Sequence, residues 1–184
     1  MDNSSNRYII TGGSGSGKSS LIKELENRGY ACFPEVSRIV ISEQQYKGGK
    51  LVPWKDMEGF ADECLRRMKK QLQNQTKQQP VFYDRGIPDI LAYLKSKNLP
   101  VPDRLYDYAR YYNPMVFICP PWNEIFRNDP QRPENFKESV KIYHYLNQVY
   151  LYLGYRLVRV PKIPVNERVR FIISKIDGLE SITG

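Results

Sequence analysis

The stretch YIITGGSGSGKSSLIKEL, residues 8–25, joins a short apolar run, a cluster of glycines around one lysine, and a second apolar pattern. The run at residues 7–11 contains two isoleucines and ends at glycine, which is typical of a buried strand. The segment after Lys18 places leucine and isoleucine on one helical face and stops at Gly29, a common helix end. The stretch therefore predicts a strand, a glycine-rich turn and a helix in direct succession.

The turn matches the phosphate-binding pattern GxxxxGK[ST]. Glycines allow the backbone to direct its N–H groups at phosphate oxygens, and the following helix directs its positive N-terminus at the same anion. We expect Lys18 to reach the β- and γ-phosphates of ATP and the Ser19 hydroxyl to ligate Mg²⁺. The residues assigned to nucleotide binding in this segment are Gly12, Gly13, Ser14, Gly15, Ser16, Gly17, Lys18, Ser19 and Ser20.

Strand and helix patterns alternate over the remaining sequence, which predicts an α/β three-layer sandwich: a five-stranded parallel sheet with helices on both faces. A length of 184 residues fits a single domain that covers residues 1–184. Ligands of such sheets bind beyond the carboxyl ends of the strands. The predicted strands are 7–11, 30–33, 80–84, 114–121 and 155–161, and the predicted helices are 18–28, 35–46, 55–77, 87–95, 103–112, 137–153 and 165–176.

Composition limits the classes of partner. The formal charge is +8, but lysine and arginine are spread along the chain, which favours a small anion such as a nucleotide over nucleic acid. Three cysteines without a CxxC pair and a single histidine do not suit a structural zinc site, and we expect reduced thiols. No apolar leader or membrane-length apolar run is present, so we expect a cytoplasmic protein without a membrane span. The sequence does not indicate an oligomeric state.

The third predicted strand ends in VFYDRG, residues 81–86, where an acid is followed by arginine. A motor ATPase usually carries a second acid at this point, and the guanine-reading NKxD pattern of GTPases does not occur in the sequence. We expect Asp84 to hold Mg²⁺, directly or through water, and Arg85 to clamp an anionic or hydroxylated acceptor. Asp89, one helical turn later, is a candidate ligand of a substrate hydroxyl or a cation. The alternative for these residues is a surface turn with a helix-capping acid.

A second polar group follows the second predicted strand in PEVSRIV, residues 34–40. Glu35 and Arg38 are three positions apart and share a helix face. Phosphoryl transfer mainly requires positioning and charge neutralisation, so one carboxylate can serve as the base for the acceptor hydroxyl. Glu35 is the candidate base, with Arg38 beside it at the substrate. The alternative is an acid in the first turn of a helix with a surface partner.

Residues 122–136 are polar, contain arginine and are interrupted by prolines. A segment of this kind can cover a bound nucleotide, exclude water and stabilise charge on the transferring phosphoryl group. Arg127 and Arg132 are the candidates for that role in this lid segment. The alternative is a loop with solvated arginines.

Three motifs, the phosphate loop, Glu-x-x-Arg after the second strand and Asp-Arg after the third, together resemble the nucleoside and nucleotide kinases of the P-loop class. Deoxynucleoside and thymidylate kinases are the clearest relatives. More closely, the chain resembles a family of small P-loop proteins that are labelled AAA-type ATP-binding domains and called predicted ATPases or kinases. The pattern appears as PEVSRIVI (34–41), VFYDRGIPDILAY (81–93), PPWNEIFRNDPQRPENF (120–136) and GYRLVRVPKIPVNERVRFI (154–172).

The resemblance to the kinases implies a role for each candidate above, and it places the segment that contains Pro161 beside the adenine. Two features depart from the kinase pattern. Gly86 stands where deoxynucleoside kinases usually have serine, and residues 47–79 carry no recognisable nucleoside-reading signature. The implied roles are a base for Glu35, an acceptor clamp for Arg85, a Mg²⁺ ligand for Asp84 and lid arginines for Arg127 and Arg132.

Two hypotheses follow. The favoured one is an ATP- and Mg²⁺-dependent phosphotransferase, or kinase, that acts on a small hydroxyl or phosphate acceptor such as a nucleoside or nucleotide. The second is a nucleotide-dependent ATPase, switch or binding module whose partner is a protein, a lipid or nucleic acid. The basic charge and the long predicted helix at 55–77, which could present a surface, support the second hypothesis.

Overall fold

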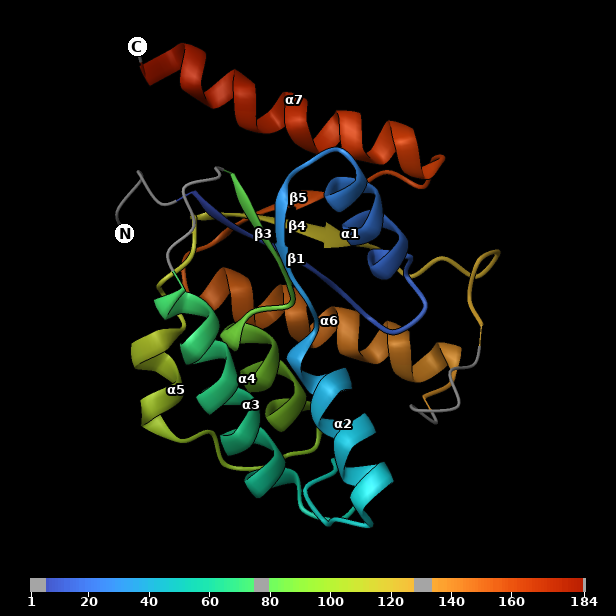
Figure 1. Ribbon diagram of the computed structural model, residues 1–184, viewed down its shortest axis with the longest axis vertical. Coiled ribbons are helices and arrows are strands. Elements are labelled where there is room, and N and C mark those ends of the chain that lie inside the picture. Colours follow the sequence, from blue (N-terminus) through green and yellow to red (C-terminus); the bar gives the residue numbers. More distant parts are fainter. Residues whose placement is uncertain (1–5, 75–79, 128–133, 184) are drawn as a thin grey trace.

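The computed structural model describes residues 6–74, 80–127 and 134–183, with side chains up to residue 178. Its centre is a five-stranded, all-parallel sheet in the order β2-β3-β1-β4-β5 (Figure 1). The strands are β1 (Arg7–Gly12), β2 (Ala31–Phe33), β3 (Val81–Asp84), β4 (Met115–Cys119) and β5 (Arg156–Arg159). The helices are α1 (Lys18–Asn27), α2 (Val36–Lys47), α3 (Met57–Gln73), α4 (Ile87–Ser96), α5 (Asp103–Tyr108), α6 (Phe136–Tyr152) and α7 (Val165–Thr183). The predicted parallel sheet is confirmed.

Helices cover both faces of the sheet and give three layers (Figure 1). Successive strand residues point to opposite faces, so Ile9 belongs to the core under α3 to α6 while Ile10 belongs to the core under α1 and α7. Tyr83 and Phe82 divide in the same way on β3. Continuous apolar strands are typical of parallel sheets, because both faces of the sheet are buried.

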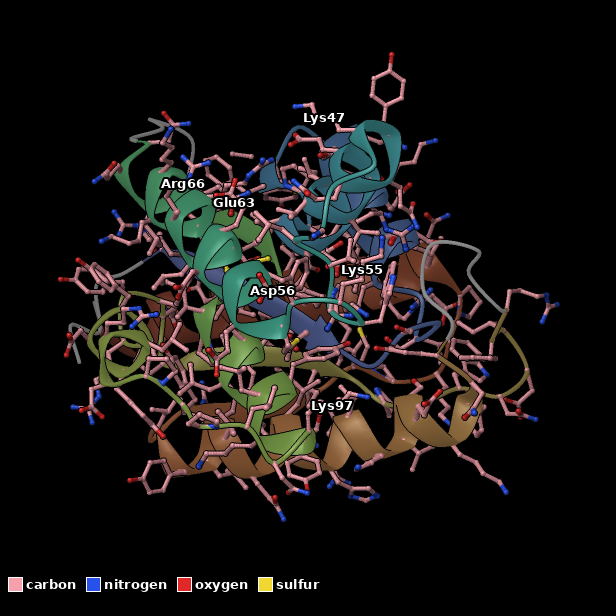
Figure 2. The ribbon with its side chains drawn as sticks, turned by 90° about the horizontal axis from the view of Figure 1, so that it is seen from below. Lys47, Lys55, Asp56, Glu63, Arg66 and Lys97 are labelled. Carbon is pink, nitrogen blue, oxygen red and sulfur yellow. The ribbon has the colours of Figure 1, made fainter. Side chains whose placement is uncertain are left out.

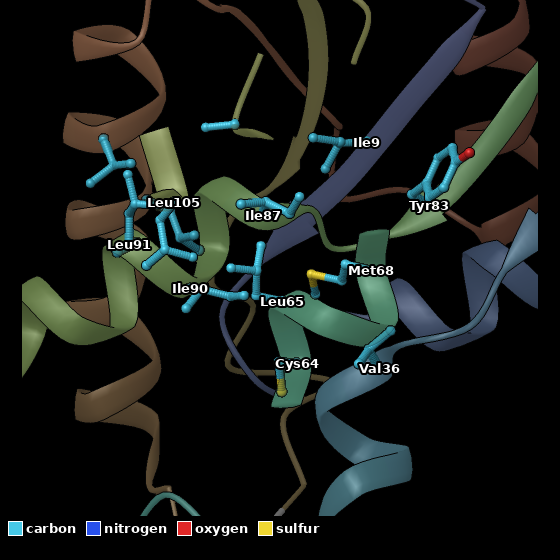
Figure 3. Packing of buried hydrophobic residues seen from close by; sticks show 14 of the residues in the cluster. Ile9, Val36, Cys64, Leu65, Met68, Tyr83, Ile87, Ile90, Leu91 and Leu105 are labelled. Atoms are coloured by element: carbon cyan, nitrogen blue, oxygen red, sulfur yellow. The ribbon is translucent and has the colours of Figure 1, made fainter. Parts of the chain in front are cut away.

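The larger core lies between the sheet and α2 to α6. Figure 3 shows Met68 of α3 and Ile90 of α4 directed toward Leu65 of α3, below Ile87. Helix α3 begins where Asp56 accepts a hydrogen bond from the backbone N–H of Gly59 at 2.9 Å, as a helix-capping residue does. This side of the sheet therefore presents a stripe of apolar α3 residues to α4.

Two predicted helices are shorter in the structure. The predicted helix 103–112 ends as α5 at Tyr108, because Tyr112 is buried edge-on against Tyr83 and Asn113 accepts a hydrogen bond from the backbone of Met115. Those contacts turn the chain into β4. The predicted helix 55–77 spans Met57–Gln73, and the last part of its predicted range lies outside the described residues. Within the described part of the chain, no helix combines the length and apolar character that a membrane crossing requires.

The register of the strands brings the predicted functional positions together at the carboxyl-terminal end of the sheet. Ile10 pairs with Asp84, and Gly12 pairs with Cys119, so β1, β3 and β4 end side by side. The phosphate loop leaves β1 at this end, and α4 begins just beyond β3. The sheet therefore places its polar strand ends where parallel sheets bind ligands.

Candidate functional site

The phosphate loop connects β1 to α1 and depends on glycine at its ends. Gly12 has a φ of 143°, and a Cβ atom there would lie 2.5 Å from the carbonyl oxygen of Cys119. Gly17 has a φ of 81° immediately before α1. Side chains at these positions would strain the backbone, so the motif glycines are required by the path of the chain.

Lys18 is buried inside the loop. Its Nζ donates a hydrogen bond to the carbonyl oxygen of Gly13 at 2.7 Å and to Ser16 Oγ at 3.3 Å. The pKa of Lys18 is lowered to about 8, chiefly by burial and next by the neighbouring positive charge of Arg85, while the negative charges of Asp84 and Glu35 act in the opposite direction. The predicted phosphate-binding lysine therefore shares one electrostatic site with the three other predicted residues.

Both described ends of the lid segment contact the phosphate loop. Ser14 Oγ donates to Glu134 Oε2 at 2.5 Å. A Cβ atom on Gly15 would lie 2.5 Å from the ring of Phe126. Arg127 is exposed, and its Nη1 donates to the backbone carbonyl of Phe126 at 2.8 Å. Arg132 lies outside the described residues, so the lid roles of both arginines stay predictions.

Arg85 joins the phosphate loop to the candidate base. It adopts a left-handed φ of 71°, which is unusual for a residue with a side chain and is found most often at functional sites. Its Nε donates to Glu35 Oε1 at 2.6 Å, and its Nη1 donates to the carbonyl oxygen of Gly12 at 2.9 Å. Nη2 is buried and makes no hydrogen bond with the described residues. The guanidinium thus has one donor group left for a ligand.

Glu35 immediately precedes α2 and is buried. Besides Arg85, it accepts a hydrogen bond from Ser37 Oγ at 2.6 Å, and its Oε2 lies 4.0 Å from Arg38 Nε. The Arg38 side chain is 41% exposed, which places it at the rim of the site. The structure therefore brings Glu35, Arg85 and Lys18 together, with Arg38 at the edge.

Asp89 receives four hydrogen-bond donors. Thr11 Oγ1 donates to its Oδ1 at 2.6 Å, and Tyr150 OH donates to its Oδ2 at 2.6 Å. Arg85 Nη1 donates to Oδ1 at 3.2 Å, and the backbone N–H of Gly86 donates to Oδ2 at 3.0 Å. The contact with Gly86 caps α4, so these contacts match the capping alternative for Asp89. Gly86 lies against Ile9, where a Cβ atom would clash, which accounts for glycine in place of serine.

The donor set suits Mg²⁺. Asp84 is buried at the end of β3, and Ser19 is exposed in the first turn of α1. Mg²⁺ prefers oxygen ligands and keeps several waters, so it is usually held by one or two protein groups together with phosphate oxygens. No cluster of three or more acidic, histidine or cysteine residues that could hold a metal occurs among the described residues. A hydroxyl and a carboxylate thus fit an ion that is shared with a bound nucleotide.

A cavity of about 180 Å³ opens beside this group, and Arg85 and Asp89 form its inner end. Its walls come from α2, the segment before α3, α3, α4 and the N-terminal part of α6. Figure 3 labels three of the wall residues, Cys64, Met68 and Ile90, and Figure 2 labels Lys97 at the end of α4. The lining residues are Ser37, Ile41, Pro53, Trp54, Met57, Phe60, Ala61, Cys64, Met68, Arg85, Asp89, Ile90, Tyr93, Lys97, Glu134 and Glu138.

Sequence reasoning missed this cavity because its α3 stripe has the helical spacing of ordinary core residues. It also missed Arg168 of α7, whose Nη1 donates to the carbonyl oxygen of Gly17 at 3.3 Å and whose guanidinium lies 5.6 Å from the ring centre of Trp122. Pro161 follows β5 and is partly buried. Arg168 thus ties α7 to the end of the phosphate loop, and the adenine contact of Pro161 stays a prediction.

Comparisons with known proteins agree with this architecture. The family model described as AAA domain matches residues 7–168. A comparison with curated proteins gave no match.

Three solved structures cover nearly the whole chain. Deoxyadenosine kinase from M. mycoides with bound dCTP is 17% identical, covers 94% of this chain and 99% of its own, and has a TM-score of 0.60. The YorR protein from Bacillus subtilis, in complex with phosphorylated GDP, is 13% identical, with coverages of 93% and 95% and a TM-score of 0.59. Thymidylate kinase from Candida albicans is 14% identical, with coverages of 95% and 92% and a TM-score of 0.58. At these identities the likeness is one of fold.

Proposed function

The chain belongs to the AAA domain family, and we propose that it is an ATP- and Mg²⁺-dependent kinase that phosphorylates a small acceptor, a nucleoside or a nucleotide. Three of its structural neighbours bear on this proposal, since two are a deoxyadenosine kinase and a thymidylate kinase and the third was solved with phosphorylated GDP. The arrangement of this chain's own site also supports the proposal, because a cavity that could hold an acceptor lies beside the predicted phosphate loop.

The observation that carries the proposal is the position of Arg85. Its guanidinium contacts the phosphate loop through the carbonyl oxygen of Gly12, contacts Glu35 at 2.6 Å and lines the cavity. A ligand in the cavity would therefore contact the same guanidinium that contacts Glu35 and the phosphate loop. An ATPase needs no such enclosed apolar space beside its phosphate loop, whereas a kinase needs a place for its acceptor.

The chemistry that this arrangement supports is a direct transfer. The acceptor oxygen forms a bond to the γ-phosphorus while the bond from that phosphorus to the β,γ-bridging oxygen breaks, and ADP leaves with the electron pair. A hydroxyl proton passes to Glu35. Lys18 stabilises negative charge on the phosphates, and Ser19 and Asp84 would hold the Mg²⁺ that neutralises them further. In this proposal Arg38 and Arg85 position the acceptor.

A transfer assay with ATP labelled on the γ-phosphate tests the proposal. The acceptors are the common nucleosides and their 5′-monophosphates, and the product is a labelled acceptor. Glu35→Gln should lower the transfer rate by roughly 10²- to 10⁴-fold, the usual contribution of a general base. Glu43→Gln is the matched control, because Glu43 lies on α2, the helix that Glu35 precedes, but pairs with Arg67 and does not line the cavity. Label released only as inorganic phosphate would contradict the kinase proposal.

A further inference from the structure

We propose that the acceptor is an uncharged nucleoside and that the cavity discriminates against nucleoside monophosphates. This inference rests on the proposed kinase function and narrows its acceptor to one chemical class. The observations behind it are the apolar walls of the cavity, the charges at its inner end and the excess of acid along its lining.

The walls suit a flat aromatic ring. Phe60, Met57 and Met68 face the space from α3, and Tyr93 and Ile90 face it from α4. A cavity of about 150 Å³ with apolar walls can hold a benzene ring, and the volume here is about 180 Å³. Trp54 lies at the mouth, with 48% of its surface exposed. The cavity therefore has a size and apolar walls that suit a nucleobase.

The charges at the inner end of the cavity determine whether an acceptor hydroxyl or an acceptor phosphate can bind there. In an acceptor nucleotide, the monophosphate would have to lie here, next to the phosphate loop. Lys18 belongs to the phosphate loop and, in the proposed transfer, serves the phosphates of ATP. Of the cations that line the cavity, Arg85 is the one at this end, and it already pairs with Glu35 at 2.6 Å and with Asp89 at 3.2 Å. Two buried carboxylates cancel its charge, so the guanidinium offers an incoming dianion no net attraction.

The remaining charged residues of the lining do not supply the missing positive charge. The lining contains three carboxylates, from Asp89, Glu134 and Glu138, and two cations, from Arg85 and Lys97. Glu134 also accepts a hydrogen bond from Ser14 of the phosphate loop, which puts an acid beside the inner end. Outside the lining, Arg38 lies 4.0 Å from Glu35 and offsets that carboxylate. The described cavity thus carries one excess negative charge before any substrate binds.

A neutral hydroxyl group fits the same place. Arg85 Nη2 is buried and makes no hydrogen bond with the described residues, so it can donate to an uncharged oxygen without needing to balance a charge. Glu35 pairs with the same guanidinium, at 2.6 Å from Arg85 Nε, and in this proposal it accepts the hydroxyl proton. A nucleoside hydroxyl uses both groups, whereas a phosphate would meet the carboxylates as like charges.

Matched pairs of acceptors test the inference. The four common deoxynucleosides, the four ribonucleosides and their 5′-monophosphates are each supplied with labelled ATP and Mg²⁺. For the preferred base, the nucleoside should have a kcat/KM roughly 100-fold above that of its monophosphate, since like-charge contacts are costly at a buried site. Equal or better use of the monophosphate would overturn the inference and leave the kinase proposal intact.

A binding measurement separates the two proposals when no label is transferred. Nucleosides and monophosphates are compared by the shift in melting temperature that each produces in the ATP-bound protein. Stabilisation by a nucleoside but not by its monophosphate supports the inference even if the kinase proposal fails. Stabilisation by the monophosphate alone, or by neither ligand, overturns the inference.

Charge variants test the stated cause. The double variant Glu134→Gln/Glu138→Gln removes two negative charges from the lining while keeping the shape of both side chains, and it should reduce the preference for the nucleoside by roughly 10-fold. Glu58→Gln is the control, because Glu58 is exposed on α3 and does not line the cavity. An unchanged preference in the double variant would show that the acid excess is not the source of the discrimination.

Discussion

The phosphate loop is formed mainly by the backbone of one segment, whereas the cavity beside it is formed by side chains from several helices. The loop is one continuous segment in which glycines, backbone carbonyls and a buried lysine make most of the contacts. The cavity is assembled from side chains of α2, α3, α4 and α6, which are far apart in the sequence. The contrast shows why kinases of this fold can share a donor site and differ in their acceptors: the backbone cradle leaves little to vary, whereas each cavity side chain can change on its own.

Arg85 lies at the boundary between these two regions and belongs to both. Its backbone N–H donates to the carbonyl oxygen of Ile10 at 3.0 Å, which fixes the turn after β3 beside β1. Its side chain contacts Gly12 on the loop side and Glu35 and Asp89 on the cavity side. Changes at the boundary should therefore affect the stability of the whole protein, whereas most changes in either region should affect the binding of one substrate. Glu134 is an exception, because it lines the cavity and also accepts a hydrogen bond from Ser14 of the loop.

The largest effect is expected from Arg85→Met. The substitution removes the cation that is shared by two buried carboxylates, and breaking a buried ion pair from one side typically costs about 3–5 kcal/mol of unfolding free energy. Denaturation in urea, followed by circular dichroism, measures the loss. Arg104→Met is the control, because Arg104 pairs with Asp62 at an exposed surface and exposed pairs contribute little. If Arg85→Met and Arg104→Met lost equal free energy of unfolding, Arg85 would contribute no more to stability than an exposed ion pair does.

A smaller effect, confined to the acceptor, is expected from Trp54→Ala. Trp54 lies at the mouth of the cavity and is 48% exposed, so its loss should leave folding intact. An aromatic contact is worth about 0.5–1.5 kcal/mol, which corresponds to a KM for the acceptor raised roughly 3- to 10-fold. The KM for ATP should not change. Tyr152→Ala, an exposed aromatic on α6 outside the cavity lining, should alter neither value.

The same contrast determines what the sequence could predict. Residues 12–19 predict phosphate binding by themselves, because a phosphate cradle of this type is a local backbone structure, and the alternating patterns correctly predicted the parallel sheet. The contact between Glu35 and Arg85 spans 50 positions, so the motifs predicted both residues but not that they pair.

The cavity could not be predicted from the sequence. Phe60 and Met68 have the spacing of core residues, and it is the packing of α3 against α2 and α4 that leaves a space beside them. Asp89 could be read as a ligand or as a cap, and its four donors depend on tertiary structure.

A moderate effect on the donor region is expected from Glu134→Gln. The carboxylate of Glu134 accepts a hydrogen bond from Ser14 of the phosphate loop, so we expect it to repel the phosphates of bound ATP. In water-like surroundings, with a dielectric constant of about 80, one like-charge contact over about 6 Å is worth roughly 0.7 kcal/mol, so neutralising this carboxylate should tighten ATP binding about 3-fold. Isothermal titration calorimetry measures the affinity. Glu138→Gln should leave ATP affinity unchanged, because Glu138 caps α6 and does not contact the loop. Weaker ATP binding in Glu134→Gln would show that the carboxylate supports the loop instead of opposing phosphate.

The smallest expected effect is the uptake of protons by Lys18 when ATP binds. Burial lowers the pKa of Lys18 to about 8 from 10.5, so between these two values the unfolded chain binds more protons and the contribution of Lys18 to stability rises with pH. At pH 8 about half of the Lys18 side chains in the folded protein are uncharged, since a group is half protonated at its pKa. Bound phosphates favour the charged form and raise this pKa, so ATP binding at pH 8 should take up about 0.5 proton.

Calorimetry in two buffers with different ionisation enthalpies measures this uptake. Near pH 6.5 Lys18 is charged with or without ATP, so its uptake should disappear. Lys18→Arg is the matched variant, because arginine keeps its charge throughout this range and has no proton to take up. The difference between the two proteins isolates Lys18 from the titration of ATP itself. If the two proteins took up equal numbers of protons at pH 8, the buried lysine would not be the titrating group, and its charge would be fixed before the nucleotide arrives.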